Sequence, residues 1–437
     1  MVTLIWPGNP VWPQWQKLLF RFSFIYFSLW ALPGTIIELF RENDFISHYW
    51  LFENWIVNSA NHYLFHSYEK LSNNDGSDSA YTWTLIRLYF LVALFICLIW
   101  SLLDRKRGNY NFLSYWFRIL LRYFLIAMLF GYGIEKIFTG QMPFPNLNQL
   151  SLPLGDFRPQ EVGWLSMGVA VKYQVFTGIV ETLAGILMLY RRTATFGTLM
   201  ALGAFTIVFM TNIGYDMQVK LFSLHLTIMC LVLLAYEYRR LSSFLLFNST
   251  TVPNNLYNVS FSKRWLRITR ILLMCVFFWQ LFIMNIYVQS SIYSERQNQI
   301  RTNPITPGIY DVPVFVVNGD TIPPVLTDSL RWQKVVFNDA IDNGYAIPYD
   351  TIFWKRIDRG FFAYTVDTIK REIQFMKSKN AASDLYPSFL MKYELPDSNT
   401  IRLSGLIRKD SVLAVLKNTH RHFILTDSKM QWLKENR

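Results

Sequence analysis

YTWTLIRLYFLVALFICLIWSLL, residues 81–103, is a predominantly apolar stretch of the length that a membrane-crossing helix needs. A helix rises about 1.5 Å per residue, so about 20 residues cross a hydrocarbon core about 30 Å thick. Similar stretches recur over the first two thirds of the chain, at residues 22–39, 113–134, 165–190, 194–213, 219–236 and 268–288. The sequence therefore predicts an α-helical membrane bundle of about seven spans.

The composition supports the same class. Hydrophobic residues make up 52% of the 437 residues and charged residues 16%, against about 25% charged in an average soluble domain. The formal net charge is +12, but the basic residues cluster at the ends of the apolar stretches, which favours the lipid bilayer over nucleic acid as partner. The three cysteines lie inside predicted spans without a CxxC pair, which excludes a disulfide framework, a thiol redox motif and a zinc knuckle.

Charge alternates between the segments that connect the spans. Lysines and arginines stand at residues 17–21, 105–107, 191–192, 239–240 and 263–267, whereas the opposite segments are acidic. By the positive-inside rule the N-terminus is cytoplasmic, and residues after about 289 lie outside. We predict a multi-pass protein of the bacterial inner (cytoplasmic) membrane with a periplasmic C-terminal domain. The first residues lack a basic start and run into a full-length span, which predicts an uncleaved signal anchor.

The chain is predicted to have four regions. These are residues 1–112 with the first two spans, 113–241 with a four-helix core, 242–289 with a cytoplasmic loop and the last span, and 290–437 with a non-cytoplasmic β-rich domain. Residues 41–80 are dense in aromatic rings, which predicts helices at the external membrane surface. His62 and His66 share a helix face there, but no companion ligand motif is near, so no metal site is predicted.

The C-terminal region changes to short alternating runs separated by turn signals at residues 318–319, 342–344 and 396–399. The runs lie at residues 312–317, 332–337, 361–366, 372–376, 389–393, 401–406, 412–416 and 422–425. About eight strands of this kind predict an antiparallel all-β sandwich or barrel. Residues 248–262 are predicted as a cytoplasmic loop and 290–307 as a linker. No catalytic constellation stands in this domain, and binding of an external protein partner is a function open to it.

Ionisable residues inside the spans are the candidates for function. A charge at the centre of a span costs about 2.5–3.5 kcal/mol, so it needs a partner and marks a functional site by default. Glu181 lies about 15 Å from the basic end of its span, close to the bilayer midplane. His225 lies about 21 Å from the basic end of its span, somewhat further out than Glu181 but within its reach. Lys220 and Lys136 stand near the external boundary. The predicted catalytic residues are Glu181, His225, Lys220 and Lys136.

Further polar residues stand at the same level of the bundle. Tyr132 and Glu135 end the third span, and a polar turn precedes the sixth. The predicted cofactor-binding residues are Tyr132, Glu135, Asn212, Tyr215 and Asp216. The alternative is a satisfied polar network that fixes helix packing. Gly178 and Gly185 flank Glu181 on one helix face, and small residues there let a neighbouring helix approach closely.

The middle of the chain resembles the DoxX-like membrane proteins. The residues behind this resemblance are GYGIEKIF (131–138), TGIVETLAGILMLYRRTATFGTL (177–199) and YDMQVKLFSLHLTIMCLVLLA (215–235). The whole chain is similar to a long form with extra N-terminal spans and a β-rich tail. Residues 76–79, Gly-Ser-Asp-Ser, stand where that form has a Gly-Ser-Gly-Asp segment. Residues 420–423, His-Arg-His-Phe, depart from its Arg-Gly-Phe-His-Trp run.

The resemblance implies a four-helix core and an association with quinones. Some DoxX-like proteins are subunits of thiosulfate–quinone oxidoreductases, and the bundle is distantly similar to the membrane part of vitamin K-dependent carboxylases. The first hypothesis is therefore a quinone-linked oxidoreductase or its membrane subunit. In it, Glu181 and His225 relay protons, and Lys220 or Lys136 polarises a quinone or a sulfur substrate. The second is a non-catalytic scaffold whose external β domain binds a partner. A transporter is the third, although no inverted repeat is visible.

Overall fold

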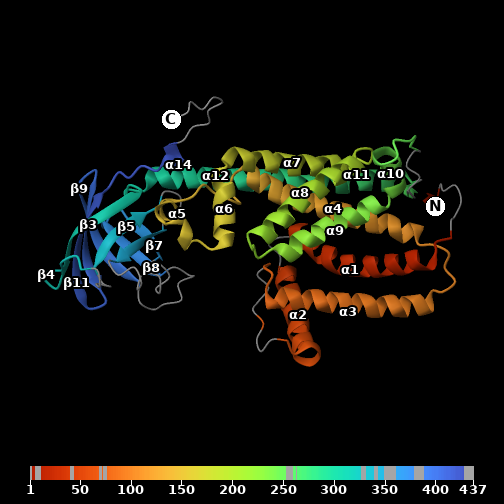
Figure 1. Ribbon diagram of the computed structural model, residues 1–437, viewed down its shortest axis with the longest axis horizontal. Coiled ribbons are helices and arrows are strands. Elements are labelled where there is room, and N and C mark those ends of the chain that lie inside the picture. The colour runs from red at the N-terminus through yellow and green to blue at the C-terminus, as the bar shows by residue number, and fades with distance from the viewer. Residues whose placement is uncertain are drawn as a thin grey trace. The chain divides into compact units, whose positions relative to one another are not determined.

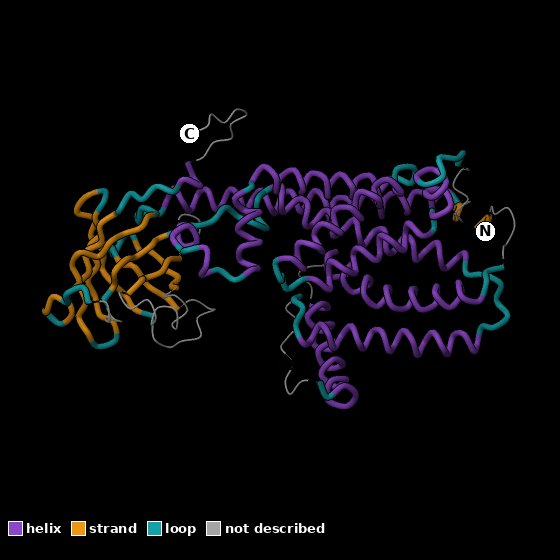
Figure 2. Tube along the Cα trace, viewed as in Figure 1, coloured by secondary structure: helices purple, strands orange, loops and turns teal. Residues whose placement is uncertain are grey.

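The computed structural model divides the chain into two compact units. One unit comprises Met1–Met142 and Arg158–Ser290, and the other comprises Pro143–Phe157 and Ser291–Arg437. The first is helical and the second consists mainly of strands, as Figures 1 and 2 show by label and by colour. The residues that the structure describes are 2–4, 11–39, 44–67, 71, 76–251, 259–261, 263–325, 331–338, 343–348, 361–377 and 388–427.

The first unit is built from long helices. They are α1 (Gln14–Leu39), α2 (Asp44–Ala60), α3 (Ala80–Leu103), α4 (Asn111–Ile137), α6 (Pro159–Val169), α7 (Val171–Leu189), α8 (Ala194–Gly214), α9 (Lys220–Ala235), α10 (Tyr238–Leu245), α11 (Arg264–Phe278) and the first part of α12 (Met284–Thr302). A π-helical turn, η3 (Trp279–Ile283), joins α11 to α12. The strands β1 (Val2–Leu4) and β2 (Val259–Phe261) pair antiparallel, with Thr3 opposite Ser260, so the predicted loop 248–262 contains a strand.

The helices are compatible with a membrane protein, but the predicted seven spans are not confirmed. Among the described residues, four helices are long and apolar enough to cross a membrane: α3, α4, α8 and the continuous helix Arg264–Asn298. Two bent pairs, α6 with α7 and α9 with α10, would raise the number to six. The predicted span 165–190 is divided by an 89° bend. Ala170 lies at the bend, and its ψ of 53° is outside the helical range, which interrupts the hydrogen-bond ladder.

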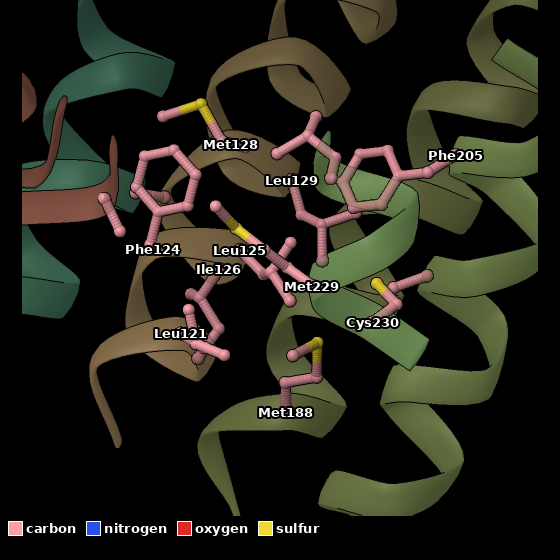
Figure 3. Packing of buried hydrophobic residues seen from close by; sticks show 14 of the residues in the cluster. Leu121, Phe124, Leu125, Ile126, Met128, Leu129, Met188, Phe205, Met229 and Cys230 are labelled. Carbon is pink, nitrogen blue, oxygen red and sulfur yellow. The ribbon is translucent and has the colours of Figure 1, made fainter. Parts of the chain in front are cut away.

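Helix α4 forms the interior of the helical unit. Of its apolar window, 61% is buried, against 17–22% for the other three long apolar helices, so α4 is surrounded by protein and they are not. It packs on α1, α7, α9 and η3. Figure 3 shows its buried side chains Leu125 and Leu129 meeting Met229 and Cys230 of α9 and Phe205 of α8.

The segment between α1 and α3 is helical, as predicted from its aromatic residues. Figure 1 shows α2 running across the direction of α1 and α3. Exposed apolar side chains, among them Phe52 and Trp55, contrast with the buried Glu53, which accepts hydrogen bonds from Tyr49 at 2.5 Å and Tyr81 at 3.1 Å. Burial raises the pKa of Tyr49 well above its usual range, and the charge of Glu53 adds to this, so Tyr49 stays a donor. A position of α2 in the headgroup layer stays a prediction.

The second unit is an antiparallel β-barrel. Its strands are β3 (Gly308–Val317), β4 (Asp320–Thr321), β5 (Trp332–Phe337), β6 (Asn343–Pro348), β7 (Phe361–Asp367), β8 (Glu372–Lys377), β9 (Phe389–Asp397), β10 (Thr400–Ile407) and β11 (Asp410–Asn418). The order is β11-β10-β9-β8-β7-β6-β5-β3-β4, and β11 also pairs with β3. That last pairing closes eight strands into a barrel, with β4 added beside β3. The alternative of a sandwich is thereby excluded.

The structure adds to or corrects three local predictions for this unit. Residues 422–425 are not a strand, because the chain turns into the short helix α14 (Ile424–Asp427). The linker 290–307 is mostly helical, since α12 continues to Thr302. Asn343 and Gly344 of the predicted turn 342–344 begin a strand, β6, that the sequence analysis missed, and residue 342 lies outside the described residues. A Cβ on Gly344 would stand 2.1 Å from the carbonyl oxygen of Val336, so this glycine permits the close strand pairing.

Aromatic side chains fill the barrel. The ring centroids of Phe337 and Tyr364 lie 5.2 Å apart, and those of Phe375 and Phe389 lie 4.9 Å apart. An eight-stranded barrel has an interior about wide enough for side chains, and here they occupy it. The buried guanidinium of Arg331 donates to the carbonyl oxygens of Ile322, Val312 and Pro313.

The segment Pro143–Phe157 belongs to the barrel unit although it lies between α4 and α6 in sequence. Its short helix α5 (Leu147–Ser151) packs Leu147 against Ile309, Val336 and Tyr345. The Tyr345 hydroxyl donates to the Asn148 carbonyl oxygen at 3.3 Å, and the Asn148 amide donates to Asn338 Oδ1 at 3.3 Å. The chain therefore passes between the two units at three points.

Replacing Phe375 by alanine should remove the centre of the aromatic packing in the barrel. We expect a loss of about 3–5 kcal/mol in the free energy of unfolding of the barrel. The matched control is Ile369→Ala in the exposed β7–β8 turn, where the change should stay within about 0.5 kcal/mol. Urea-dependent hydrogen exchange of β8 and β9 peptides in the solubilised full chain measures both. Equal effects of the two variants would contradict a packed interior.

Candidate functional site

A buried ion pair joins α4 to α7. The ammonium of Lys136 near the end of α4 bonds to Oε1 of Glu181 in the middle of α7, and their side chains are 9% and 5% exposed. Both are among the predicted catalytic residues, and the structure brings them together. Because a lone charge in this position would be costly, the pair stabilises each partner and fixes the two helices in register.

Glycines allow the two helices to approach at this pair. A Cβ on Gly178 would stand 2.6 Å from the carbonyl oxygen of Gly133 and 2.9 Å from Cβ of Lys136. A Cβ on Gly133 would stand 3.0 Å from the carbonyl oxygen of Gly178. A larger residue at either position would separate the backbones, and the lysine would then have to reach further. The expectation that small residues beside Glu181 permit close helix approach is met at Gly178.

Several polar atoms on the buried face of α7 have no hydrogen-bond partner in the protein. They are Oε2 of Glu181, Oγ1 of Thr182 and both amide atoms of Gln174. These residues are two helical turns apart at most and share one face. Unsatisfied buried groups are rare in native proteins and call for an explanation. The pair is thus firmly held, while one carboxylate oxygen remains available for a further bond.

His225 lies in a different environment. Its Nδ1 is 2.6 Å from the Leu221 carbonyl oxygen, which can only accept, so Nδ1 carries the proton. Its Nε2 then accepts from the Tyr26 hydroxyl at 2.7 Å. The ring stacks on Trp30 with centroids 4.1 Å apart and planes 5° from parallel. Both nitrogens of a neutral imidazole are therefore bonded, Nδ1 within α9 and Nε2 to Tyr26 of α1.

Lys220 belongs to a third group of residues, at the start of α9. Its ammonium bonds to Asp216 at 2.7 Å and to the Met217 carbonyl oxygen at 2.9 Å. Asp78 accepts from the backbone N–H groups of Lys220 at 2.7 Å and Leu221 at 3.0 Å. A carboxylate on the first N–H groups of a helix satisfies orphan donors and the helix dipole. Asp78 therefore holds the segment before α3 against the start of α9.

The remaining predicted residues lie around these groups. Asn212 is buried and donates to Ser223 Oγ at 2.9 Å, tying the end of α8 to α9. Tyr215 packs against Gly163 of α6, where a Cβ would meet its ring at 2.8 Å. Tyr132 packs on Phe222 with ring centroids 6.1 Å apart. Glu135 lies beside Gly140, which donates its N–H to the Glu135 carbonyl oxygen at 2.9 Å.

The nine predicted residues thus divide between separate bonding groups. No hydrogen bond or ion pair joins Glu181 to His225 in the part of the chain that the structure describes, and each has its own partners. Sequence reasoning missed Tyr26 and Trp30, which stand four apart on the first predicted span and therefore share a face. It also missed the capping role of Asp78. That the nine predicted residues act as one catalytic and cofactor site stays a prediction.

Potential metal ligands are scattered among the described residues. No group of three or more histidine, cysteine, aspartate or glutamate residues that could hold an ion occurs among them. His62 and His66, which share a helix face in the sequence, are both exposed, and His66 ends the helical turn Asn61–Phe65 in a left-handed conformation.

Comparisons with known proteins leave the family open. No family model matches the chain. Over 128 residues the chain is 28% identical to "Uncharacterized protein YwoB" of Bacillus subtilis (strain 168), an alignment that covers 27% of this chain and 75% of that protein. No solved structure matches. The resemblance to DoxX-like proteins stays a prediction, as does the one to carboxylases.

Replacing Gly178 by alanine should separate α4 from α7. Its new methyl group would meet backbone atoms, so we expect a loss of about 1–3 kcal/mol in stability. Gly131→Ala on α4 is the control, because a Cβ there meets no atom within 4 Å. Thermal unfolding of the detergent-solubilised protein measures both. A variant at Gly178 as stable as the control would argue against close helix contact.

Removing one partner of the Lys136–Glu181 pair should reduce stability more than removing both partners. Lys136→Met leaves a buried carboxylate, and Glu181→Met leaves a buried ammonium, so each single variant should lose about 3–5 kcal/mol. The double variant leaves no uncompensated charge and should unfold at a higher temperature than either single variant. The double-mutant cycle is read from thermal unfolding in one detergent. Strict additivity would show that the two side chains do not interact.

Proposed function

We propose that the chain is a non-catalytic membrane scaffold whose β-barrel binds an external protein partner. In this proposal the helical unit crosses the bacterial inner membrane about seven times, and the barrel is periplasmic, as the positive-inside rule predicts. The supporting observation is the bonding of the two groups best suited to chemistry. Glu181 is paired with Lys136, and both ring nitrogens of His225 are bonded. These bonds favour a packing role.

The barrel offers a surface for such a partner. Its interior is filled by side chains, so binding would use the outer face. There, Leu390 and Leu395 on β9 and Leu406 on β10 are about half exposed or more, at 50%, 46% and 60%. Exposed apolar side chains on neighbouring strands are typical of protein-binding surfaces. The ion pair of Arg402 with Glu394, at 3.7 Å, lies on the same two strands.

The connectivity of the barrel unit also suits a scaffold. The chain passes between the units at three points, and α5, from the segment before α6, packs on the barrel. A domain joined to its membrane unit in several places loses less conformational entropy on binding than one on a single linker.

Site-specific photo-cross-linking in cells tests the scaffold proposal. A photoreactive residue at Leu406 should give a discrete adduct with one protein, whereas the same residue at Ile369, in the exposed β7–β8 turn, should not. Solubilised protein with unchanged thermal unfolding is the control for folding. Absence of an adduct from Leu406, Leu390 and Leu395 alike would refute partner binding at this face.

A quinone-linked oxidoreductase of DoxX-like type is the second candidate. The observations that favour it are the unbonded Gln174 Nε2, which could donate to a quinone carbonyl, and the unbonded Glu181 Oε2, which could accept from a quinol hydroxyl. The Lys136→Met/Glu181→Met double variant separates the candidates, because it removes the chemistry and retains the packing. Lipid extraction and mass spectrometry should find no quinone with either protein if the chain is a scaffold. A quinone bound to the native protein and lost from the double variant would establish the oxidoreductase hypothesis instead.

A further inference from the structure

A large cavity lies within the helical unit, away from the residues discussed so far. It has a volume of about 1700 Å³ and is lined by α4, the α7–α8 turn, α8, α9, α10 and α11. None of the nine predicted site residues lines it. Ligand pockets in proteins commonly measure about 300–1,000 Å³, so this cavity could hold a large molecule.

Arginines from four elements converge on the cavity. The described lining contains six arginines and one acidic residue, Glu237. The arginines are Arg118 and Arg122 on α4, Arg191 and Arg192 in the α7–α8 turn, Arg240 on α10 and Arg270 on α11. Since these positions are far apart in sequence, the fold and not a local basic run gathers the charge.

The single carboxylate cannot balance this charge. Glu237 bonds to Arg240 at 2.7 Å. The guanidinium of Arg122 stands over the ring of Tyr123, 5.4 Å from its centre. Nε of Arg122 and Nε of Arg240 are buried and have no hydrogen-bond partner in the protein. Buried donors of this kind favour an anion with several acceptor oxygens, and guanidinium groups match phosphate geometry well.

The cavity also has an apolar wall. Leu273, Met274, Val276 and Phe277 of α11 line it together with Leu199 of α8 and Leu233 of α9. Phe277 stands two helical turns beyond Arg270, about 10 Å along the helix axis. Leu273 and Val276 are 65% and 63% exposed, so this wall is open to the surroundings of the helices. The ligand that fits has an anionic head and an apolar tail.

We propose that this cavity binds a phosphate-bearing lipid, with its headgroup among the arginines and its chains along α11. A quinone is uncharged and would leave the six arginines without a counter-charge. A soluble phosphate has no apolar part to contact the apolar wall. By the positive-inside rule these arginines lie at the cytoplasmic surface, where basic pockets between helices bind anionic headgroups. The proposal is independent of the scaffold function, because it does not involve the barrel.

Native mass spectrometry of the full chain in detergent, titrated with phosphatidylglycerol or with phosphatidylcholine of the same chains, tests it. We expect one phosphatidylglycerol to bind at least about tenfold more tightly than phosphatidylcholine, because charge-assisted bonds form only with the anionic head. Arg122→Gln/Arg270→Gln should abolish this preference. Arg239→Gln/Arg267→Gln removes the same charge from α10 and α11 at exposed positions that do not line the cavity, and should retain it.

Further arms separate the alternatives. If Arg122→Gln/Arg270→Gln fails to fold, Arg191→Gln/Arg192→Gln can replace it, because it alters only the exposed turn. It should give the same loss of preference for phosphatidylglycerol. Inorganic pyrophosphate, added as a competitor, should displace the lipid only weakly. Equal binding of the two lipids, an equal loss in the control variant, or pyrophosphate binding more tightly than phosphatidylglycerol would each overturn the proposal.

Discussion

The contact of α4 with α7 depends on a charge pair that neither helix could bury alone. Lys136 and Glu181 neutralise each other where water is scarce, and Gly133 and Gly178 bring the backbones close enough for the pair to form. Because α4 is the interior helix of the unit, its partners α1, α7 and α9 all take their positions from its surface. An error in this register would shift the packing of each neighbour.

Both units must bond polar groups that cannot reach water, and they do so in different ways. In the helical unit, polar groups that cannot reach water bond to one another: His225 to Tyr26, Asn212 to Ser223, and the start of α9 to Asp78. The barrel instead satisfies its backbone through closure of β11 on β3 and fills its interior with aromatic rings. The helical unit therefore holds a charge pair in its interior, whereas the barrel interior consists mainly of apolar and aromatic side chains.

Local pattern predicted the elements better than it predicted their partners. The helix at residues 81–103 and most strand positions followed from hydropathy and alternation, because these depend on near neighbours in sequence. The bend at Ala170 and the choice of barrel over sandwich depend on long-range packing that no local pattern records. Likewise, the sequence placed Glu181 and His225 at depths within reach of each other, but which helix faces each one is set by the whole bundle. Arg118 and Arg122 stand inside a predicted span, and their sequence positions do not show that α11 and the α7–α8 turn line the same cavity.

The small sheet of β1 and β2 has a consequence for how the chain threads the membrane. Strands can pair only when they lie on the same side of a bilayer, so a chain that spans a membrane as proposed must cross it an even number of times between Leu4 and Val259. Six crossings satisfy this parity and five do not. The pairing also cannot form until residue 261 has been synthesised, after every intervening helix. A chain that inserted one helix wrongly would leave both strands unpaired, so this sheet distinguishes correct from incorrect insertion.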